Sequence, residues 1–109
     1  MAGMTLFWFS HRLSSTDPAV QLANLRRARE RLAYLQPAWK RDRGIWLAAP
    51  WLDWAEAGVP EDEAWRRIGI VLPWHTGIVI DRDGAPESPG MIREWNIMSA
   101  LGRPVEVVL

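Results

Sequence analysis

Hydrophobic positions along the chain predict strands and helices in alternation. Short, nearly continuous apolar runs, typical of buried strands, lie at residues 4–9, 44–50, 76–80 and 105–108. Longer segments between them carry apolar residues at helical spacing. This order predicts an α/β fold whose open parallel sheet has about four strands, with right-handed connections and helices on both faces.

The first predicted helix begins at Asp17, an N-cap residue, with Pro18 at the first helical position. Its apolar residues repeat as far as about Gln36, and residues 37–43 are predicted to form a polar connection. We interpret the arginines on the other face as a solvent-exposed surface, with nucleic-acid binding as the weaker alternative. These arginines are Arg26, Arg27, Arg29 and Arg31.

The second predicted helix follows a turn at residues 58–60 and carries three acids in its first turn, where the helix dipole favours negative charge. Trp65, Ile68 and Leu72 form its apolar stripe, and Pro73 ends it.

The last predicted helix runs from Met91 to Leu101 and contains a carboxylate on its apolar side. At about 100° per residue, Glu94 falls between Met98 and Leu101 and faces the body of the protein. One interpretation is that Glu94 is partly exposed or pairs with one of the 12 arginines. The other is that a polar pocket holds it as a nucleophile or a substrate clamp.

The start of this helix combines a hydroxyl group with free helix N–H groups, at Ser88, Gly90 and Met91. Such a combination binds anions. Arg12 and Arg82 lie in loops at the same predicted edge of the sheet. We therefore expect phosphate, sulfate or a nucleotide 5′-phosphate to bind here.

Polar residues also follow three predicted strands, at the edge where open α/β sheets bind ligands. Ser10 and His11 follow the first strand, Asp53 follows the second and Asp81 follows the third. We expect them to bind substrate, although a single loop histidine is more commonly only solvated. The expected borders of the pocket are Ser10, Pro50, Asp81 and Ser88.

Length, composition and charge exclude several classes of protein. A chain of 109 residues is expected to form one domain. With 13 basic and 13 acidic residues, no global charge favours a nucleic acid or an anionic membrane. The chain has no cysteine, which excludes disulfides, cysteine metal sites and a cysteine nucleophile and fits a cytoplasmic location. We expect no signal peptide and no membrane segment.

We expect neither a metal ion nor a cofactor. The turn at residues 81–84 lacks the later glycine and the final glutamate of a calcium loop. Eight tryptophans against one tyrosine suggest exposed aromatic surface in addition to a packed core. We therefore predict a homodimer or larger homo-oligomer with tryptophan in the contact.

The pattern Ser88-x-Gly90-x-x-x-Glu94 resembles the nucleoside 2-deoxyribosyltransferase superfamily, which includes deoxynucleoside monophosphate N-glycosidases and many small bacterial and phage proteins. The exit from the last helix at residues 102–105 also looks like this superfamily, and the stretches at residues 24–28, 49–51 and 88–91 are similar to its phage-type members. The resemblance implies one domain over residues 1–109, with a three-layer, flavodoxin-like or Rossmann-like fold.

The resemblance also implies that Glu94 attacks C1′ of a deoxyribosyl group and that Ser88 holds a 5′-phosphate. A fixed carboxylate suits this role, since it can stabilise and trap an oxocarbenium-like centre. Two departures from the family pattern occur. The first loop, usually glycine-containing, is Ser10-His11-Arg12, and the aspartate that protonates the leaving base falls near Gly69. Residues that could replace that aspartate are Asp53, Glu63, His75 and Asp81.

Three functions remain open from the sequence. The first is a nucleotide N-glycosidase or 2-deoxyribosyltransferase. The second is a non-catalytic module that binds a nucleotide or nucleotide sugar. The third is a structural phage protein without a pocket. In the first two cases the partner is a small-molecule nucleotide or nucleoside.

Overall fold

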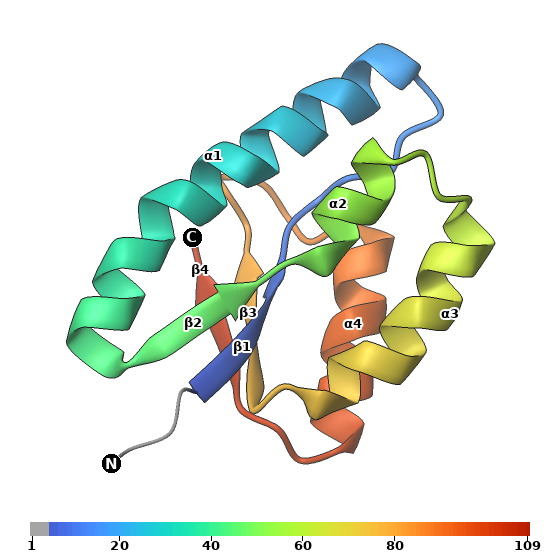
Figure 1. Ribbon diagram of the computed structural model, residues 1–109. Coiled ribbons are helices and arrows are strands. Elements are labelled where there is room, and N and C mark those ends of the chain that lie inside the picture. The colour runs from blue at the N-terminus through green and yellow to red at the C-terminus, as the bar shows by residue number, and fades with distance from the viewer. Residues whose placement is uncertain (1–4) are drawn as a thin grey trace.

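A computed structural model describes residues 5–109 of the chain (Figure 1). Met4, which the sequence pattern assigned to the first strand, lies outside the described residues. The elements are β1 (Thr5–Ser10), α1 (Pro18–Arg43), β2 (Ile45–Ala48), α2 (Pro50–Glu56), α3 (Glu61–Val71), the 3₁₀ turn η1 (Leu72–Trp74), β3 (Gly77–Asp81), α4 (Pro89–Ala100) and β4 (Val105–Val108).

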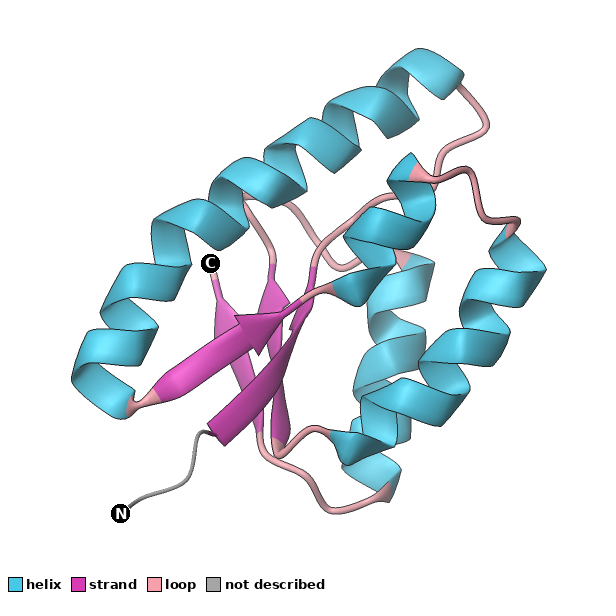
Figure 2. Cartoon of the chain, in the orientation of Figure 1, coloured by secondary structure: helices cyan, strands magenta, loops and turns pink. Residues whose placement is uncertain are grey.

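The four strands form one parallel sheet in the order β2-β1-β3-β4. Helix α1 covers one face of this sheet, and α2, α3 and α4 lie on the other (Figure 2). This arrangement confirms the predicted three-layer α/β fold. From β1 the chain moves to β2 on one side and later returns to β3 on the other side. The C-terminal ends of β1 and β3 therefore flank the point where such sheets bind ligands.

The side chains of β1 alternate between the two layers of helices, as the pleat of a strand requires. Phe7 points to the α1 side, where its ring lies 6.3 Å from that of Trp39. Trp8 points to the α4 side, where its indole N–H donates to Glu94. Both neighbouring strands pair with β1, and Trp8 and Phe9 are completely buried. Strand β1 thus packs an apolar side chain against α1 on one face of the sheet and presents a hydrogen-bond donor to α4 on the other.

Helix α1 continues through Pro37 to Arg43, so the prediction of a polar connection at residues 37–43 was wrong. Proline costs one helix hydrogen bond, but packing on both sides of it compensates. Trp39 packs against the core, and the Gln36 side chain bonds the backbone of β2 at Ile45 O and Leu47 N. The helix ends only at Gly44, which has a φ of 64°.

Helix α2 was also missed. The predicted second strand ends at Ala48 instead of Pro50, and Pro50 opens the short helix. Trp51 and Leu52 are buried on it. A helix of seven residues is too short to show a helical period in the sequence.

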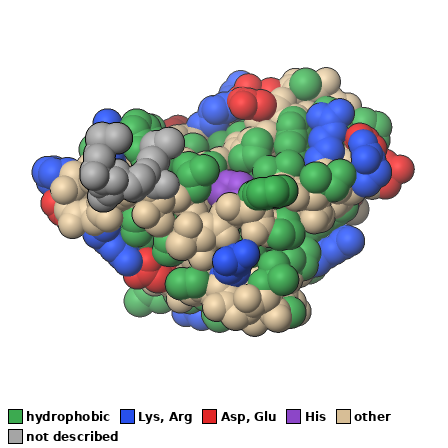
Figure 3. Space-filling view, turned by 60° about the horizontal axis from the view of Figure 1, so that its bottom comes forward, with side chains coloured by type: hydrophobic (Ala, Val, Ile, Leu, Met, Phe, Trp, Pro, Cys, Tyr) green, Lys and Arg blue, Asp and Glu red, His purple; other side chains and the backbone are tan. Residues whose placement is uncertain are grey.

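The tryptophans are distributed over the core and the surface. Two are buried, four are half-buried, and Trp46 and Trp74 are exposed, Trp74 by 84%. Figure 3 shows hydrophobic side chains on one face of the molecule among scattered basic groups. The predicted homo-oligomer stays a prediction, with Trp46 and Trp74 as the tryptophans exposed enough to contribute. Among residues 5–109, no helix has both the length and the apolar character needed to cross a membrane.

Replacing Gly77 by alanine should destabilise the protein. A Cβ atom there would lie 2.7 Å from the Phe7 ring and 2.8 Å from the carbonyl oxygen of Pro104. We expect Gly77→Ala to lower the free energy of unfolding by about 1–3 kcal/mol. Gly69→Ala is the matched control, because a Cβ there meets nothing within 4 Å, and it should stabilise helix α3 by about 0.5–1 kcal/mol. Urea unfolding of both variants checks this, and equal stabilities would contradict the packing described.

Candidate functional site

The Glu94 carboxylate is buried between α4 and the sheet and is held by two uncharged donors. The indole Nε1–H of Trp8 donates to Oε2 at 2.8 Å, and the Ser10 hydroxyl donates to Oε1 at 2.7 Å. The residue is only 6% exposed. Among residues 5–109 no cation forms an ion pair with Glu94, so the interpretation as an arginine pair does not hold. The helical period of the sequence correctly predicted that this side chain faces the body of the protein.

The local sequence explains this arrangement. Trp8 and Ser10 are two residues apart on β1 and therefore point to the same face of the sheet. Helix α4 begins at the N-cap Ser88 and crosses that face, which brings Glu94 over both donors. The donor Trp8 was not recognised in the sequence. Its position two residues before Ser10 on a buried strand was the available signal.

The surroundings of Glu94 favour its neutral form. Burial raises its pKa to about 7, and the hydrogen bonds from Ser10 and Trp8 oppose this rise only in part. Both protonation states are therefore populated near neutral pH. A carboxylate with such a pKa can act as a base, an acid or a nucleophile under physiological conditions.

Glu94 contributes to the wall of a cavity of about 550 Å³, a size typical of small-molecule sites. The cavity lies beyond the C-terminal end of β1, and residues of α2, α3, the start of α4 and Gln21 of α1 line it. Its apolar part includes Trp51, Trp65 and Ile68. Its polar part includes His11, Gln21, Glu61, Ser88, Arg93 and Glu94.

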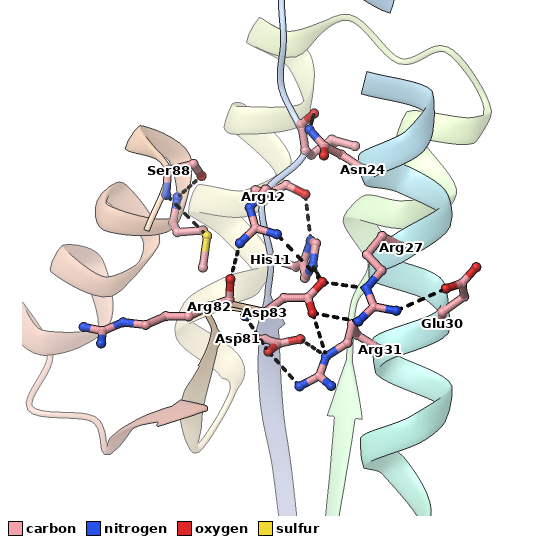
Figure 4. Close-up of polar contacts among 12 residues, drawn as sticks. His11, Arg12, Asn24, Arg27, Glu30, Arg31, Asp81, Arg82, Asp83 and Ser88 are labelled. Atoms are coloured by element: carbon pink, nitrogen blue, oxygen red, sulfur yellow. Dashed lines mark hydrogen bonds and ion pairs between the residues drawn. The ribbon is translucent and has the colours of Figure 1, made fainter. Parts of the chain in front are cut away.

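The predicted anion corner forms one end of this cavity, since Ser88, Gly90 and Met91 all line it. The Ser88 hydroxyl accepts from the Met91 N–H at 3.4 Å, and the Ser88 N–H points to the Met91 sulfur at 3.4 Å (Figure 4). The N–H of Gly90, in the first turn, has no acceptor within the helix. An anion would thus accept hydrogen bonds from the Gly90 N–H and from the Ser88 hydroxyl, whose oxygen already accepts from Met91.

The other acids predicted at the sheet edge do not join Glu94. Asp81 is fully buried but accepts from both Nε and Nη2 of Arg31, at 2.9 and 3.0 Å. Asp53 is mostly exposed and accepts from Arg29 at 2.8 Å. Neither residue lines the cavity, nor does Ser10, which reaches it only through Glu94. Arginines of α1 thus pair with both aspartates. Asp81 lies on the side of the sheet opposite to Glu94, and Asp53 lies at the edge of the sheet.

His11 lines the cavity within a network of charged groups (Figure 4). Its Nε2 lies 3.0 Å from an Asp83 carboxylate oxygen, and its Nδ1 lies 2.8 Å from the Arg12 carbonyl oxygen. Arg27 donates twice to Asp83, at 2.8 and 2.9 Å, which is the main reason that the pKa of Asp83 lies well below its usual range. Both ring nitrogens of His11 are therefore engaged, and the histidine is not simply solvated.

The two arginines expected beside the anion are used in this network instead. Arg12 donates to the Arg82 carbonyl oxygen and lies 3.8 Å from Asp83. Arg82 donates from Nε to Glu87 at 2.6 Å. Neither arginine lines the cavity.

The position at which the resemblance places a general acid holds no acid. Gly69 lies on α3, and a Cβ atom added there would meet nothing within 4 Å, while the preceding Ile68 lines the cavity. Glu63 pairs with the neighbouring arginines of α3, and His75 packs edge-on against Trp8 at 5.2 Å. Burial lowers the pKa of His75, which favours its neutral form. Glu61, which the sequence suggested only as a first-turn acid of α3, is the second carboxylate in the cavity wall.

In comparisons with known proteins, no family model, no curated protein and no solved structure matches the chain. The resemblance stated from Ser88, Gly90 and Glu94 therefore remains a hypothesis about function. Among residues 5–109, no cluster of three or more potential metal-ligating side chains occurs.

The Trp8 indole proton should report the ionisation of Glu94. Because Trp8 donates directly to the carboxylate, its Nε1–H signal in ¹H–¹⁵N NMR spectra should titrate with a midpoint near pH 7. The Trp8→Phe variant assigns the signal, and Glu94→Gln should abolish the titration. A midpoint near the ordinary value of 4.5 would show that burial does not control this group.

Glu94→Gln should also stabilise the protein, and more so at higher pH. The pKa of Glu94 is raised on folding, so the folded protein keeps a proton that the unfolded chain releases between about pH 4.5 and 7. The contribution of Glu94 to the free energy of unfolding is therefore fully present below about pH 4.5 and is lost as the pH rises to about 7.

A glutamine can retain both contacts, accepting from Trp8 and donating to the Ser10 hydroxyl. We expect the variant to gain up to about 3 kcal/mol relative to wild type between pH 5 and pH 8, measured by urea unfolding. A pH-independent difference for Glu94→Gln would contradict the raised pKa.

Proposed function

We propose that the protein cleaves or transfers the N-glycosidic bond of a deoxynucleoside monophosphate, with Glu94 as the nucleophile. The observation that supports this most is the buried Glu94 carboxylate in the cavity wall, which Trp8 and Ser10 fix and which has no counter-cation among residues 5–109. An unpaired carboxylate suits a reaction in which positive charge develops at a sugar carbon.

In the proposed reaction, the bond between C1′ and the base nitrogen breaks while a bond from C1′ to a Glu94 oxygen forms. The leaving base takes up a proton. Water, or a second base, then attacks C1′, gives a proton back to the group that protonated the first base, and frees the carboxylate, so that hydrolysis or transfer results. The donors Trp8 and Ser10 fix the orientation of the carboxylate throughout.

The rest of the cavity suits the other parts of such a substrate. The Trp51 Nε1–H is committed to the Phe9 carbonyl oxygen at 2.8 Å, so Trp51 offers the ligand only its apolar ring. Trp51, Trp65 and Ile68 would border the base. Ser88 and Gly90 would meet the 5′-phosphate at the start of α4.

Glu61 is the group we assign to proton donation to the leaving base. Besides Glu94, the groups of the cavity wall that can exchange a proton are Glu61 and His11. Both ring nitrogens of His11 are bonded, to Asp83 and to the Arg12 carbonyl oxygen. Glu61 can therefore act without breaking an internal contact.

A non-catalytic nucleotide-binding module is the second candidate. It is favoured by Gly69, which stands where the resemblance places an aspartate, and by the ion pairing of Glu63 on the same helix. Such a module would keep the cavity and the anion corner but would release no base.

Incubation with a panel of deoxynucleoside monophosphates, with free base measured by chromatography, tests the proposal. Wild type should release base, and the ascending limb of its kcat/KM profile should lie near pH 7, where Glu94 ionises. Glu94→Gln should lower turnover by about 10³-fold or more while nucleotide binding, measured by thermal shift, largely survives.

Glu106→Gln is the control, because this glutamate pairs with Arg43 outside the cavity. It should leave turnover unchanged. Undiminished base release by Glu94→Gln would refute the assigned nucleophile. Nucleotide binding by wild type without any base release would favour the binding module.

A further inference from the structure

Arg93 is the one arginine or lysine in the cavity wall formed by the described residues. It is exposed and lies on α4 directly before Glu94. Nine of the twelve arginines of the chain form ion pairs, including Arg12 and Arg82 in the loops. Within residues 5–109, the three without an ion pair are Arg26, Arg93 and Arg103. Arg93 alone among these three borders the cavity.

The Trp65 ring positions the Arg93 side chain. The guanidinium carbon lies 4.1 Å from the ring centroid, a cation–π contact that leaves the N–H donors at the edge of the group free. Trp65 also packs beside the start of α4, since a Cβ atom on Gly90 would lie 3.5 Å from its ring. The aromatic ring thus connects the cation with the end of the cavity that contains Ser88 and Gly90.

From this arrangement we infer that Arg93 makes the cavity selective for ligands that carry a phosphomonoester. A guanidinium group binds phosphate through two parallel N–H donors, which an uncharged helix start cannot supply. The inference rests on the proposed function for the rest of the ligand, a deoxynucleoside. Arg93, on α4, thus has the anion-binding role that the sequence suggested for Arg12 and Arg82, both of which are paired internally.

A carboxylate also borders this region. Glu61 lines the same cavity, and Glu61, Asp62 and Arg66 lie with Arg93 around an adjoining hollow, where Arg66 is paired with Glu63. Neither Glu61 nor Asp62 forms an ion pair with Arg93 in the described part of the chain. Asp62, and Glu61 once it has given up its proton, would repel a phosphate placed beside them. The Arg93 guanidinium offsets this repulsion as well as binding the ester.

Isothermal titration calorimetry with four proteins tests the inference: wild type, Arg93→Ala, Arg93→Lys and the control Arg26→Ala, an exposed arginine outside the cavity. The ligands are a deoxynucleoside monophosphate, the matching deoxynucleoside, 2-deoxyribose 5-phosphate and inorganic phosphate. Arg93→Ala should weaken monophosphate binding by about tenfold or more, with nucleoside binding unchanged. Arg93→Lys should retain part of the affinity, and Arg26→Ala should resemble wild type.

The four ligands distinguish a nucleotide from a sugar phosphate as the source of the bound phosphate. An Arg93-dependent affinity for 2-deoxyribose 5-phosphate but not for the nucleotide would support a sugar phosphate as the natural ligand. The inference is overturned if Arg93→Ala binds the monophosphate as tightly as wild type, or if it loses nucleoside and monophosphate equally, as a merely structural support of Trp65 would. It is also overturned if wild type does not bind the phosphorylated ligands.

Failure of the proposed function looks different. If phosphate-dependent binding disappears in Arg93→Ala but wild type releases no base, Arg93 has the inferred role and the glycosidase proposal is wrong. If wild type releases base equally well from nucleosides and monophosphates, the glycosidase proposal stands and the role of Arg93 is wrong.

Discussion

The Glu94 carboxylate is removed from water and receives only two uncharged donors in return. Burying a carboxylate is costly, and a nearby cation is the usual compensation. Here the compensation comes from the Trp8 indole and the Ser10 hydroxyl, both on β1. The site therefore requires a central strand that presents these donors to the face crossed by α4. The parallel order with β1 in an interior position provides this strand.

The sheet also separates two kinds of electrostatic environment. On the α1 side, acids of β3 and β4 are neutralised by arginines of α1: Asp81 by Arg31 and Glu106 by Arg43. On the α4 side, Glu94 has no such partner among the described residues. Because the strands alternate their side chains, these two environments lie back to back without mixing. Kept apart from the arginines of α1, the Glu94 carboxylate has a pKa that burial raises.

The sequence was sufficient to predict the parallel fold, which follows from the alternation of strands and helices along the chain. It also predicted the inward direction of Glu94, which follows from the helical period of one element. It was insufficient for α1 beyond Pro37, since the packing of Trp39 that compensates for the proline involves a distant strand. The same limit applies to the ion pairs of Asp53 and Asp81, which the sequence did not predict. Their arginine partners lie 24 and 50 residues away in the sequence, and only the fold brings them together. Likewise, Arg93 could not be distinguished from eleven other arginines until their ion pairs were visible.

The most direct test of Glu94 as a nucleophile is to trap its glycosyl ester. A deoxynucleoside monophosphate with fluorine at C2′ slows breakdown of such an intermediate, because the fluorine disfavours the oxocarbenium-like transition state. Mass spectrometry of the intact protein, followed by peptide mapping, should show one added fluorodeoxyribose phosphate group, carried by Glu94. Release of base without modification of Glu94, or an adduct on another residue, would contradict this account.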